Sequence, residues 1–595
     1  MINKKTWGRV LLSSMIATSL LACQQDDNKT EIANNSLAQV TPITLKTASD
    51  LPHYLERSVQ DEVFYFVLPD RFHNANTDND NGSKTIVLSQ GGFDPSNKAM
   101  YHGGDIPGLK EKLPYLKDMG ISAIWLTPIM RNQALQGDSS GYHGYWILDF
   151  TEIDPHLGSN DDLKAFIDAA HKENIKVFFD IITNHTADVI KYKECHLPDS
   201  TPLNACEYKS LAEVAKSGTY TPYLPEGAEN VKVPAWLNDP KYYHNQGETT
   251  YEGENSVYGD FASLDDINTD DPEVVKGMTE IFKNVISEFK PDGFRIDTVK
   301  HVNIEFWQAF APSLVEHAIA EGIPQFFMFG EVYAPNPDIL SKYTTTGKMQ
   351  SVLDFAFQDA IAKTLVQKQG TDSFKALFEQ DHKYNDADSH SDQLLNFVGN
   401  HDMGRMGYML NTSEENYSEA EKIQRILLGH ALMYFNRGIP VVYYGDEQGF
   451  TGDGNDQGSR QDMMPSKVDS YNDDDLLATD KTTADDNFDK NHIFYRTFAK
   501  YADLYFSHKA LRFGKQKIIY SQATPGTFAF TRSLENEELL IVANTSTASV
   551  SQALNITKDL SLVYQSDDKG HKNLKQDKAT IVTLPALSFA IYRIK

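Results

Sequence analysis

The chain of 595 residues is 40% hydrophobic and 11% aromatic, which is typical of a folded globular protein and excludes a disordered one. Its formal net charge is −28. That charge argues against a nucleic-acid partner, because binding phosphates requires clustered Lys and Arg.

The N-terminus has the pattern of an export signal. Three basic residues precede an apolar run from 10 to 22, which is shorter than the ~20 residues that span a membrane. The run ends at Cys23 in a tetrapeptide that resembles a bacterial lipobox. We therefore expect a lipoprotein signal peptide at 1–22, lipidation of Cys23, and a flexible lipid-anchored tether at 23–55. An ordinary signal peptide followed by a chance cysteine is the alternative.

The residue after the lipid-carrying cysteine is Gln24 rather than Asp. In signals of this type, that choice implies the outer membrane, at either its periplasmic or its cell-surface face. The expected localisation is therefore an exported protein that is held to the membrane by its lipid.

Two further cysteines, Cys195 and Cys206, lie in one polar stretch. In an oxidising compartment such a pair predicts a disulfide. A zinc site is the alternative, but it would need a second close pair of cysteines, and His196 alone does not replace one.

Eight short apolar runs end in polar residues, and helix-like segments separate most of them. The runs are 63–68, 123–126, 177–179, 293–296, 326–329, 352–357, 394–398 and 441–444. This alternation predicts an α/β fold, a closed (β/α)8 TIM barrel whose active site lies at the C-terminal ends of its strands. We place the catalytic barrel at residues 56–185 and 261–505.

Three regions depart from the alternation. More than a hundred residues separate the third run from the fourth, so residues 186–260 are predicted to form an inserted subdomain after strand 3. Residues 506–595 hold short apolar runs between turn residues, which predicts a C-terminal antiparallel β-sandwich. The Asp- and Gly-rich stretch 452–484 is predicted to be a long exposed loop.

Acidic residues follow several of the predicted strands, among them Asp180, Asp297, Glu331 and Asp402. A single one could form a structural ion pair, but four on one rim are costly unless they serve chemistry. Arg295 shares a strand face with Asp297 and is expected to lower the pKa of that carboxyl group. Glu331 ends an apolar strand, which is expected to raise its pKa. This asymmetry suits a retaining glycosidase, which needs a nucleophile and an acid/base.

The motifs around these residues resemble the α-amylase family, glycoside hydrolase family 13. The matching stretches are 180–185, 264–268, 293–301, 329–332, 397–402 and 438–447. The resemblance covers roughly residues 60 to 595. It implies that Asp297 is the nucleophile, Glu331 the acid/base, and Asp402 the third carboxylate, which holds and distorts the sugar.

The same resemblance implies a set of substrate-binding residues. They are His143, Tyr145, His185, Arg295, Lys300, His301 and His401. Tyr145 would stack on the sugar before the cleaved bond, and His185 and His401 would hydrogen-bond it. Lys300 and His301 would line the leaving side. Without these motifs, Tyr145 would be interpreted as a residue of the hydrophobic core, and Lys300 and His301 as charged residues of the surface.

Two polar stretches, 70–82 and 101–105, resemble the calcium site of cyclodextrin glycosyltransferases and related amylases, and their oxygen-rich composition suits Ca²⁺. The implied ligands are Asn74, Asn76, Asn79, Asp80, the Gly103 carbonyl and Asp105. A solvated turn is the alternative. Asn74 stands where that group usually has Asp, and Asp80 stands where it often has Asn. The negative charge therefore lies at a different position in this chain, while the number of oxygen ligands is the same.

A second calcium ion is implied by Asn184, Asp266 and the carbonyl of His301. It would hold the inserted subdomain to the barrel. The expected cofactor is therefore Ca²⁺, with the number of ions left open.

The expected function is hydrolysis of internal α-1,4-glucosidic bonds in starch, glycogen or maltodextrins by a three-domain, monomeric α-amylase. Cyclodextrin glycosyltransferases usually carry two further domains, and neopullulanases one before the barrel. A cyclomaltodextrin glucanotransferase, another α-1,4-glucan transglycosylase or a cyclomaltodextrinase of the same family is the alternative. A non-catalytic sugar-binding lipoprotein is a further alternative, which the three carboxylates argue against.

Overall fold

The computed structural model describes residues 45–82, 91–567, 571–576 and 579–595. The predicted signal peptide, Cys23 and most of the predicted tether lie outside these ranges. Among the helices of the described residues, each is too short or too polar to cross a bilayer.

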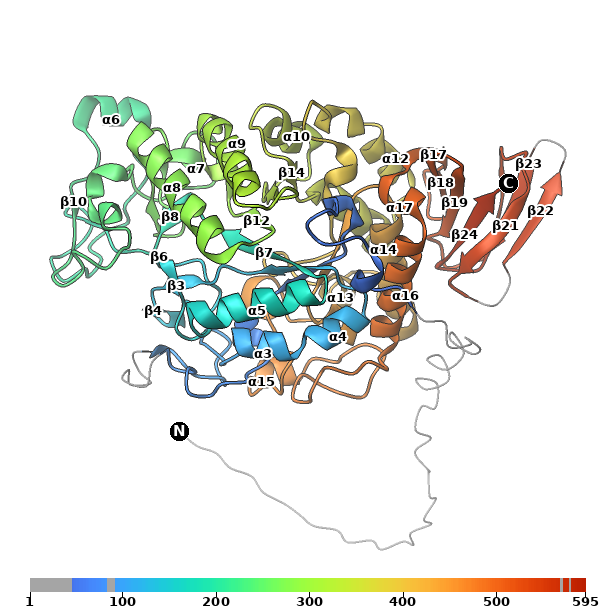
Figure 1. Cartoon of the computed structure of the whole chain (residues 1–595), viewed down its shortest axis with the longest axis horizontal. Coiled ribbons are helices and arrows are strands. Elements are labelled where there is room, and N and C mark those ends of the chain that lie inside the picture. The colour runs from blue at the N-terminus through green and yellow to red at the C-terminus, as the bar shows by residue number, and fades with distance from the viewer. Residues whose placement is uncertain (1–44, 83–90, 568–570, 577–578) are drawn as a thin grey trace, which may run out of the picture.

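Eight parallel strands form a barrel in the middle of the molecule (Figure 1). In order around it they are β1 (Phe64–Val67), β2 (Ala123–Leu126), β7 (Lys176–Ile181), β12 (Gly293–Ile296), β13 (Phe327–Gly330), β14 (Ser351–Val352), β15 (Leu395–Asn396) and β16 (Ile439–Tyr443). β16 pairs with β1, and a parallel bridge from Leu353 to Leu395 joins β14 to β15. The barrel therefore closes, and the predicted (β/α)8 fold is confirmed.

The barrel strands are buried along their whole length, as strands of a parallel sheet that is covered on both faces must be. Aromatic rings fill the interior, where Phe66 stacks on Trp125 at 3.7 Å between ring centroids. The sixth strand is shorter than predicted. Asp354 ends it by accepting a hydrogen bond from the Phe357 backbone, which starts a helix where strand had been expected.

Helices surround the barrel, and three of them begin at capping residues that the sequence shows. Ser159, Asp271 and Ser418 accept backbone hydrogen bonds at the starts of α5 (Asn160–Lys172), α8 (Pro272–Phe289) and α14 (Glu419–Phe435). The other helices of the barrel region are α3 (Ile106–Glu111), α4 (Leu113–Asp118), α9 (Ile304–Ala320), α10 (Pro337–Thr345), α11 (Phe355–Ile361), α12 (Asp372–Phe378), α13 (Met406–Asn411), α15 (Asp469–Asn472) and α16 (Ile493–Ser507).

The long connection after β7 projects from one end of the molecule, on the left of Figure 1. Its elements are β8 (His185–Thr186), β9 (Lys191–Tyr192), α6 (Leu211–Ser217), β10 (Pro222–Tyr223), α7 (Asn255–Tyr258) and β11 (Asp265–Asp266). β8 pairs with β11, so the beginning and the end of the connection lie together. Cys195 and Cys206 form the predicted disulfide.

Between β2 and α5 the chain forms two small antiparallel pairs beside this connection. They are β3 (Met130–Asn132) with β6 (Ile147–Ile153), and β4 (Leu135–Gln136) with β5 (Ser139–Ser140).

The stretch 452–484 is not the exposed loop that its composition predicted. Ser459, Gln461 and Met463 have no exposed surface. The hydroxyl group of Tyr444 donates to the Gln461 carbonyl at 2.8 Å, and the Met463 backbone donates to Arg71 at 2.8 Å. The prediction was wrong because polar residues there bond to each other and to the barrel rather than to water.

The C-terminal region, on the right of Figure 1, follows α17 (Lys509–Phe513) and contains two antiparallel sheets. The larger sheet has the order β17 (Lys515–Tyr520), β18 (Thr527–Leu534), β19 (Glu537–Asn544), β24 (Ser588–Ile594) and β21 (Leu560–Gln565). The smaller has the order β20 (Val550–Leu554), β23 (Ala579–Leu584) and β22 (Lys572–Gln576). The predicted sandwich is present, and β22 is a strand that the sequence pattern had not indicated.

The three central strands of the larger sheet, β18, β19 and β24, are largely buried on both faces. Phe530 and Ile541 belong to the core that is shared with the barrel, whereas their neighbours Ala529 and Leu540 pack in the core of the sandwich. Phe528 stacks on Phe374 of α12 at 4.9 Å. The alternation of side chains along each strand thus joins the sandwich to the barrel.

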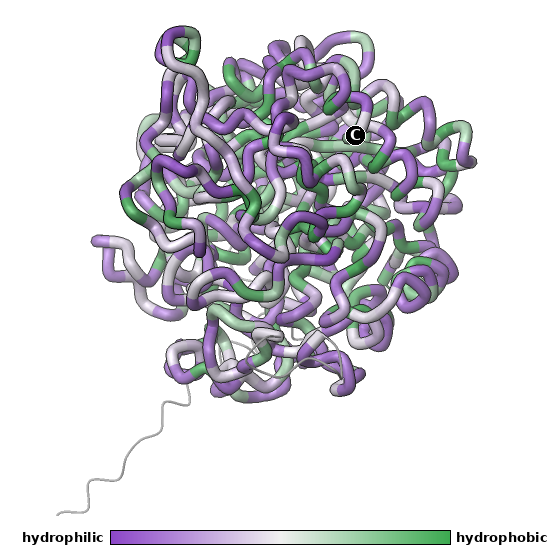
Figure 2. Tube along the Cα trace, turned by 90° about the vertical axis from the view of Figure 1, so that its left-hand side faces the viewer, coloured by the Kyte–Doolittle hydropathy of each residue, from purple (hydrophilic) through white to green (hydrophobic). Residues whose placement is uncertain are grey.

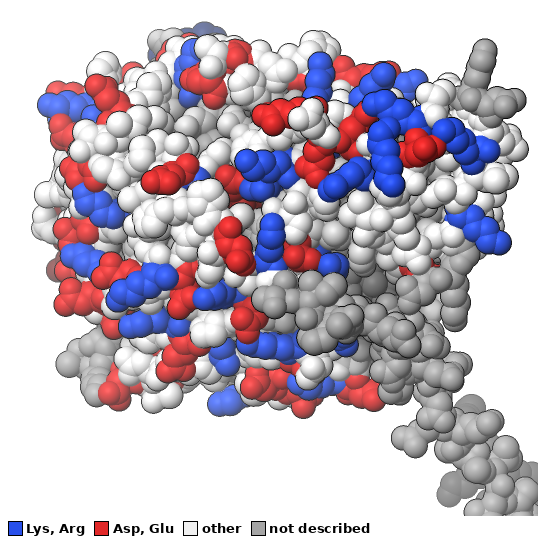
Figure 3. All heavy atoms as spheres, turned by 45° about the vertical axis from the view of Figure 1, so that its right-hand side comes forward, with Lys and Arg blue, Asp and Glu red and all other residues white. Residues whose placement is uncertain are grey.

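Hydrophilic and hydrophobic stretches alternate along the chain on the side drawn in Figure 2. On the face drawn in Figure 3, basic and acidic side chains are interspersed rather than gathered into one continuous field of either sign.

Candidate active site

Two carboxylates follow neighbouring barrel strands. The backbone of Asp297, after β12, donates to Ile181 at 2.9 Å, and that of Glu331, after β13, donates to Ile296 at 2.8 Å. Both residues are more than nine-tenths buried. The Thr298 backbone donates to Glu331 Oε2 at 3.0 Å, which fixes this carboxylate beside the end of β12.

One guanidinium group joins these carboxylates. Arg295 Nη1 lies 2.7 Å from Asp297 Oδ1, and its Nη2 lies 3.9 Å from Glu331 Oε2. Nη1 also donates to Asp180 Oδ1, at the end of β7, at 2.8 Å. Because the two nitrogens belong to one planar group, three strand-end carboxylates are gathered around it.

Burial raises the pKa of Glu331 to about 7; Arg295 opposes this shift, and the charges of Asp297 and Asp402 add to it. Burial also raises the pKa of Asp297, against the effect of Arg295. The sequence predicted the direction for Glu331 correctly. Arg295 lowers the pKa of Asp297 as predicted, but the cost of removing the carboxylate from water is larger, so the net shift is upward. Glu331, with its raised pKa, is the carboxyl group suited to hold a proton.

The third carboxylate, Asp402, follows β15 and keeps 39% of its side chain exposed. Arg460 holds it from the stretch after β16, with Nη2 3.1 Å from Asp402 Oδ1. Arg460 also donates from Nε to the His401 carbonyl at 3.2 Å. Asp402 is thus partly open to solvent while one of its oxygens is bound.

Tyr145 lies beside this group of carboxylates. Its hydroxyl group donates to Asp180 Oδ2 at 3.1 Å and lies 2.8 Å from His401 Nε2. The ring of His401 stacks on that of Tyr145, and His143 Nδ1 accepts from the Tyr145 backbone at 3.0 Å. Burial lowers the pKa of both histidines well below its usual value, so these rings form an uncharged wall.

His185 and His301 meet through Phe261. The His185 ring stacks on Phe261 at 5.8 Å, and the His301 ring meets the edge of Phe261 at 5.0 Å. Burial lowers the pKa of each histidine to about 4. Lys300 donates to the carbonyl of Tyr333, two residues after Glu331, at 3.4 Å. The predicted site residues therefore surround one group of carboxylates at the C-terminal ends of the strands.

The family model for the catalytic domain of α-amylase matches residues 66–487, which hold the barrel and all three predicted catalytic carboxylates. The chain belongs to the α-amylase family. An α-amylase of Streptomyces lividans is 44% identical over an alignment 463 residues long, which covers 74% of this chain and 50% of that protein. This α-amylase family chain thus spans about half the length of that curated relative.

Solved α-amylase family structures have the same architecture. The cyclomaltodextrin glucanotransferase CldA, described as having a three-domain ABC distribution, superposes with a TM-score of 0.69 at 25% identity, over 90% of this chain and 99% of that one. An Anoxybacillus α-amylase gives a TM-score of 0.67 at 26% identity, over 90% and 98%.

Several residues of the first predicted calcium site lie together. Asn74 Nδ2 donates to Asp80 Oδ1 at 2.7 Å, and Gly103 approaches so closely that a Cβ there would lie 2.8 Å from that oxygen. The Oδ1 atoms of Asn74 and Asn79 are buried without a hydrogen-bond partner among the described residues. Such unsatisfied oxygens beside a carboxylate fit a Ca²⁺ site.

The other two predicted ligands border this group. Asp105 accepts from the Asn76 backbone at 2.9 Å and from the Gly108 backbone at 2.6 Å, where α3 begins. The side chain of Asn76 is exposed, and its Oδ1 accepts from the Asp78 backbone at 3.2 Å.

The second predicted calcium site is at the junction of β8 and β11. The Asn184 carbonyl accepts from Ile267 at 2.9 Å, next to Asp266. Burial raises the pKa of Asp266 well above its usual value, while burial lowers that of its neighbour His244, 2.5 Å away, to about 4. Asn184 lies just before β8 and Asp266 lies in β11, so the pairing of these two strands brings two of the three predicted ligands to one junction.

Sequence reasoning missed several residues of the site. Asp180 was noted at a strand end but given no role, and it binds both Arg295 and Tyr145. Arg460 lay in the stretch read as an exposed loop. Phe261 precedes a matched motif, but its ring contacts have no signal in a single sequence. A basic residue shortly after the eighth strand could have pointed to Arg460.

Proposed function

We propose that this chain is a retaining glycoside hydrolase that cleaves internal α-1,4-glucosidic bonds of starch, glycogen or maltodextrins. The observation that carries the proposal is the pair Asp297 and Glu331 on adjacent strand ends, with Arg295 between them. Membership of the α-amylase family and the similarity to an α-amylase support this substrate.

In the first step, an Asp297 oxygen forms a bond to the anomeric carbon of the sugar while the bond to the leaving glycosidic oxygen breaks. Glu331 gives its proton to that oxygen, so the leaving chain departs with a free hydroxyl group. The pKa of Glu331, raised to about 7, keeps this proton available. Arg295 holds Asp297 in place through its hydrogen bond.

In the second step, Glu331 takes a proton from water, and the water oxygen attacks the same anomeric carbon. The ester bond to Asp297 breaks, and the sugar is released with its original anomeric configuration. Asp402 and the wall formed by Tyr145 and His401 would hold the sugar during both steps. Neutral rings suit this role because the substrate is uncharged.

Asp297→Asn tests the mechanism. We expect starch hydrolysis to fall by at least about 10⁴-fold, since the nucleophile is lost, while the circular dichroism spectrum is unchanged. Asp138→Asn, at an exposed position outside the site, should keep full activity. With the wild type, proton NMR recorded immediately after the reaction starts should show that the newly formed reducing ends are α-anomers. A fully active Asp297→Asn protein would overturn the proposal.

A second candidate activity is transglycosylation, which would form cyclic or lengthened glucans. It is favoured by the likeness to CldA, which has a three-domain distribution, so the domain number does not separate the two activities. Chromatography of products from starch and maltoheptaose decides between them. Linear short products support hydrolysis, and cyclic products support transfer.

We infer further that the chain holds Ca²⁺, with Asn74, Asn79, Asp80 and Gly103 among the ligands of one ion. Asn184, Asp266 and the carbonyl of His301 would hold a second ion. When bound, the ion supplies positive charge that neutralises buried carboxylates and ties loops together.

The lipobox-like sequence before Cys23 supports a proposal that the protein is exported and lipid-anchored to the outer membrane. We propose separately that it is a monomer. Mass spectrometry of the N-terminal peptide should find an acylated Cys23. Cys23→Ala should move the protein from the membrane fraction to the soluble fraction. Unmodified Cys23 in the purified membrane form would contradict the proposal, and sedimentation tests the monomer.

A further inference from the structure

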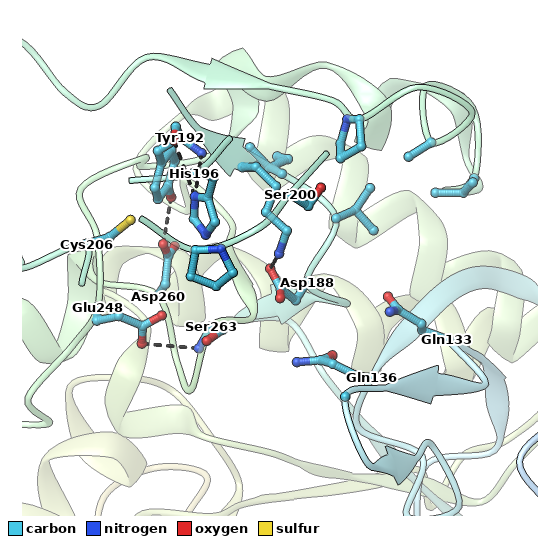
Figure 4. Close-up of a pocket in the computed structure, with 18 of the residues that line it drawn as sticks. Gln133, Gln136, Asp188, Tyr192, His196, Ser200, Cys206, Glu248, Asp260 and Ser263 are labelled. Atoms are coloured by element: carbon cyan, nitrogen blue, oxygen red, sulfur yellow. Dashed lines mark hydrogen bonds and ion pairs between the residues drawn. The ribbon is translucent and has the colours of Figure 1, made fainter. Parts of the chain in front are cut away.

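Tyr142 is a buried tyrosine that the proposed reaction does not use, and only 3% of it is exposed. It follows the β4–β5 hairpin, whose residue Gln136 lines the cavity drawn in Figure 4. The turn that carries Tyr142 is closed by a hydrogen bond from the Gly144 backbone to the Gly141 carbonyl at 2.9 Å. Gly144 has a φ of +88°, and a Cβ there would collide with the Pro128 carbonyl oxygen. The turn is therefore packed against the chain just after β2, which fixes the place of Tyr142.

Two arginine side chains meet at Tyr142. The guanidinium group of Arg71 lies 3.9 Å from the centroid of the Tyr142 ring, and Arg460 Nη1 donates to the Tyr142 hydroxyl oxygen at 3.3 Å. Arg71 is itself held, because its Nη2 donates to the carbonyls of Lys98 at 3.0 Å and Met100 at 2.9 Å. The ring is thus fixed on one face by Arg71, while its hydroxyl group holds Arg460.

The contact with Tyr142 sets the orientation of the Arg460 guanidinium group. Nε of Arg460 donates to the His401 carbonyl at 3.2 Å, and its Nη2 lies 3.1 Å from Asp402 Oδ1. Within the described part of the chain, the Tyr142 hydroxyl group is the one hydrogen-bond acceptor of Nη1. Because the guanidinium group is planar, the bonds at Nε and Nη1 determine the direction in which Nη2 points.

A second carboxylate competes for the same nitrogen. Asp456 Oδ1 lies 2.6 Å from Arg460 Nη2, and the Asp456 side chain is 62% exposed. Without a partner for Nη1, the guanidinium group would be free to turn toward Asp456 and solvent. Asp402 would then lose its charged hydrogen-bond partner.

We propose that Tyr142 is a positioning residue for the third carboxylate: its hydroxyl oxygen holds Arg460, and Arg460 holds Asp402 against the sugar in the transition state. The proposal rests on the proposed function and deepens it, since it adds to that site a residue that acts through Arg460. Its effect should therefore appear in the rate of bond cleavage more than in the binding of substrate.

Tyr142→Phe removes the hydroxyl group and keeps the ring that Arg71 contacts. We expect kcat and kcat/KM for maltoheptaose each to fall about fivefold, with KM within about twofold of the wild-type value. Tyr505→Phe is the matched control, because it also loses a buried hydroxyl group, which donates to the Gln60 carbonyl at 2.8 Å. The control should lower the melting temperature and leave kcat unchanged. An unchanged kcat for Tyr142→Phe would overturn the proposal.

A double-mutant cycle separates an action through Arg460 from an independent effect of Tyr142. In the Arg460→Ala background, Tyr142→Phe should change kcat by less than about 1.5-fold, because the group that Tyr142 positions is already absent. A further fivefold fall in that background would show that Tyr142 acts by another route and would reject the proposal.

A crystal structure of Tyr142→Phe tests the same contacts without turnover. We expect the Arg460 guanidinium group to turn toward Asp456, and the Asp402 carboxylate to leave its wild-type orientation. If both side chains keep their wild-type positions, the positioning role is refuted, whatever the activity. If the wild type cleaves no α-glucan, the proposed function fails, and the positions of Arg460 and Asp402 in this variant still decide whether Tyr142 holds them.

Discussion

The guanidinium group of Arg460 lies 3.1 Å from Oδ1 of Asp402. These residues follow different barrel strands, and Arg460 comes from a stretch that is polar in sequence yet buried in the structure. The same nitrogen lies 2.6 Å from Asp456, so Arg460 is shared between an active-site carboxylate and the stretch itself. Arg460 thereby connects the conformation of this stretch to the position of Asp402.

Arg460→Ala should reduce kcat/KM on soluble starch by about 30-fold, which corresponds to about 2 kcal/mol of lost transition-state stabilisation. The physical reason is that Asp402 loses a charged hydrogen-bond partner and is no longer held in one orientation. Arg131→Ala, whose side chain is 51% exposed, is the control and should have normal rates. Normal rates for Arg460→Ala as well would show that Asp402 needs no such partner.

Asp180→Ala should destabilise the protein by about 3 kcal/mol in chemical denaturation. It removes a partner of Arg295, so the positive charge of this buried guanidinium group is no longer balanced by the nearby carboxylates. Activity should fall too, because Arg295 can shift away from Asp297. Asp480→Ala, at an exposed position, should leave the unfolding midpoint in place. A midpoint for Asp180→Ala within error of the wild type would count against this role.

The pH profile should show a descending limb near pH 7. Glu331 must carry a proton to act as an acid, and its pKa is raised to about 7, so kcat/KM falls as pH rises through that value. The charge of Asp402 contributes to this raised pKa. In Asp402→Asn the pKa of Glu331 should therefore be lower than in the wild type. The residual activity of this variant should begin to fall at a lower pH than wild-type activity does. If the descending limb of Asp402→Asn lies at the wild-type pH or at a higher pH, the role of Glu331 as the acid is contradicted.

Removal of the disulfide should weaken the connection after β7. Cys206→Ser opens a short loop and should cost about 2–4 kcal/mol, mainly through the greater freedom of the unfolded chain. Thermal melts with and without reductant measure the effect. Reductant should lower the melting temperature of the wild type and leave that of Cys206→Ser unchanged. Identical melts for all four samples would exclude a stabilising role.

Calcium should raise the melting temperature of protein that has first been stripped with EDTA. At a hundredfold excess over Kd the gain is about 2.7 kcal/mol for a single site. Asp80→Ala should lose most of the response, because this carboxylate lies at the centre of the first group of oxygens. Asp138→Ala, which is exposed, should respond as the wild type does. Equal melting temperatures in EDTA and in calcium would reject both metal sites.

The barrel could be predicted from the sequence because its strands are buried on both faces and therefore appear as continuous apolar runs. The strand ends followed directly, and with them the positions of Asp297 and Glu331. β22 could not be found in the same way, since all of its residues are exposed and no apolar alternation marks it.

Contacts between distant segments were beyond the sequence. The buried stretch that carries Arg460 has the composition of a solvated loop, because its polar groups are satisfied inside the protein. For Asp297 the sequence showed one of the two opposing effects on its pKa. Its partner Arg295 is visible in the sequence, but the degree of burial that outweighs this partner is a property of the packed barrel.

The first described residues pack against the N-terminal ends of the barrel strands. The side chain of Asn174, just before β7, donates to the Ala48 carbonyl at 2.7 Å, and Arg57 donates to the carbonyls of Ser122 and Asn174. The carboxylates lie at the opposite ends of the same strands. The described chain thus begins at the end of the barrel opposite the carboxylates, and the lipid anchor proposed at Cys23 would be joined to the protein through that end.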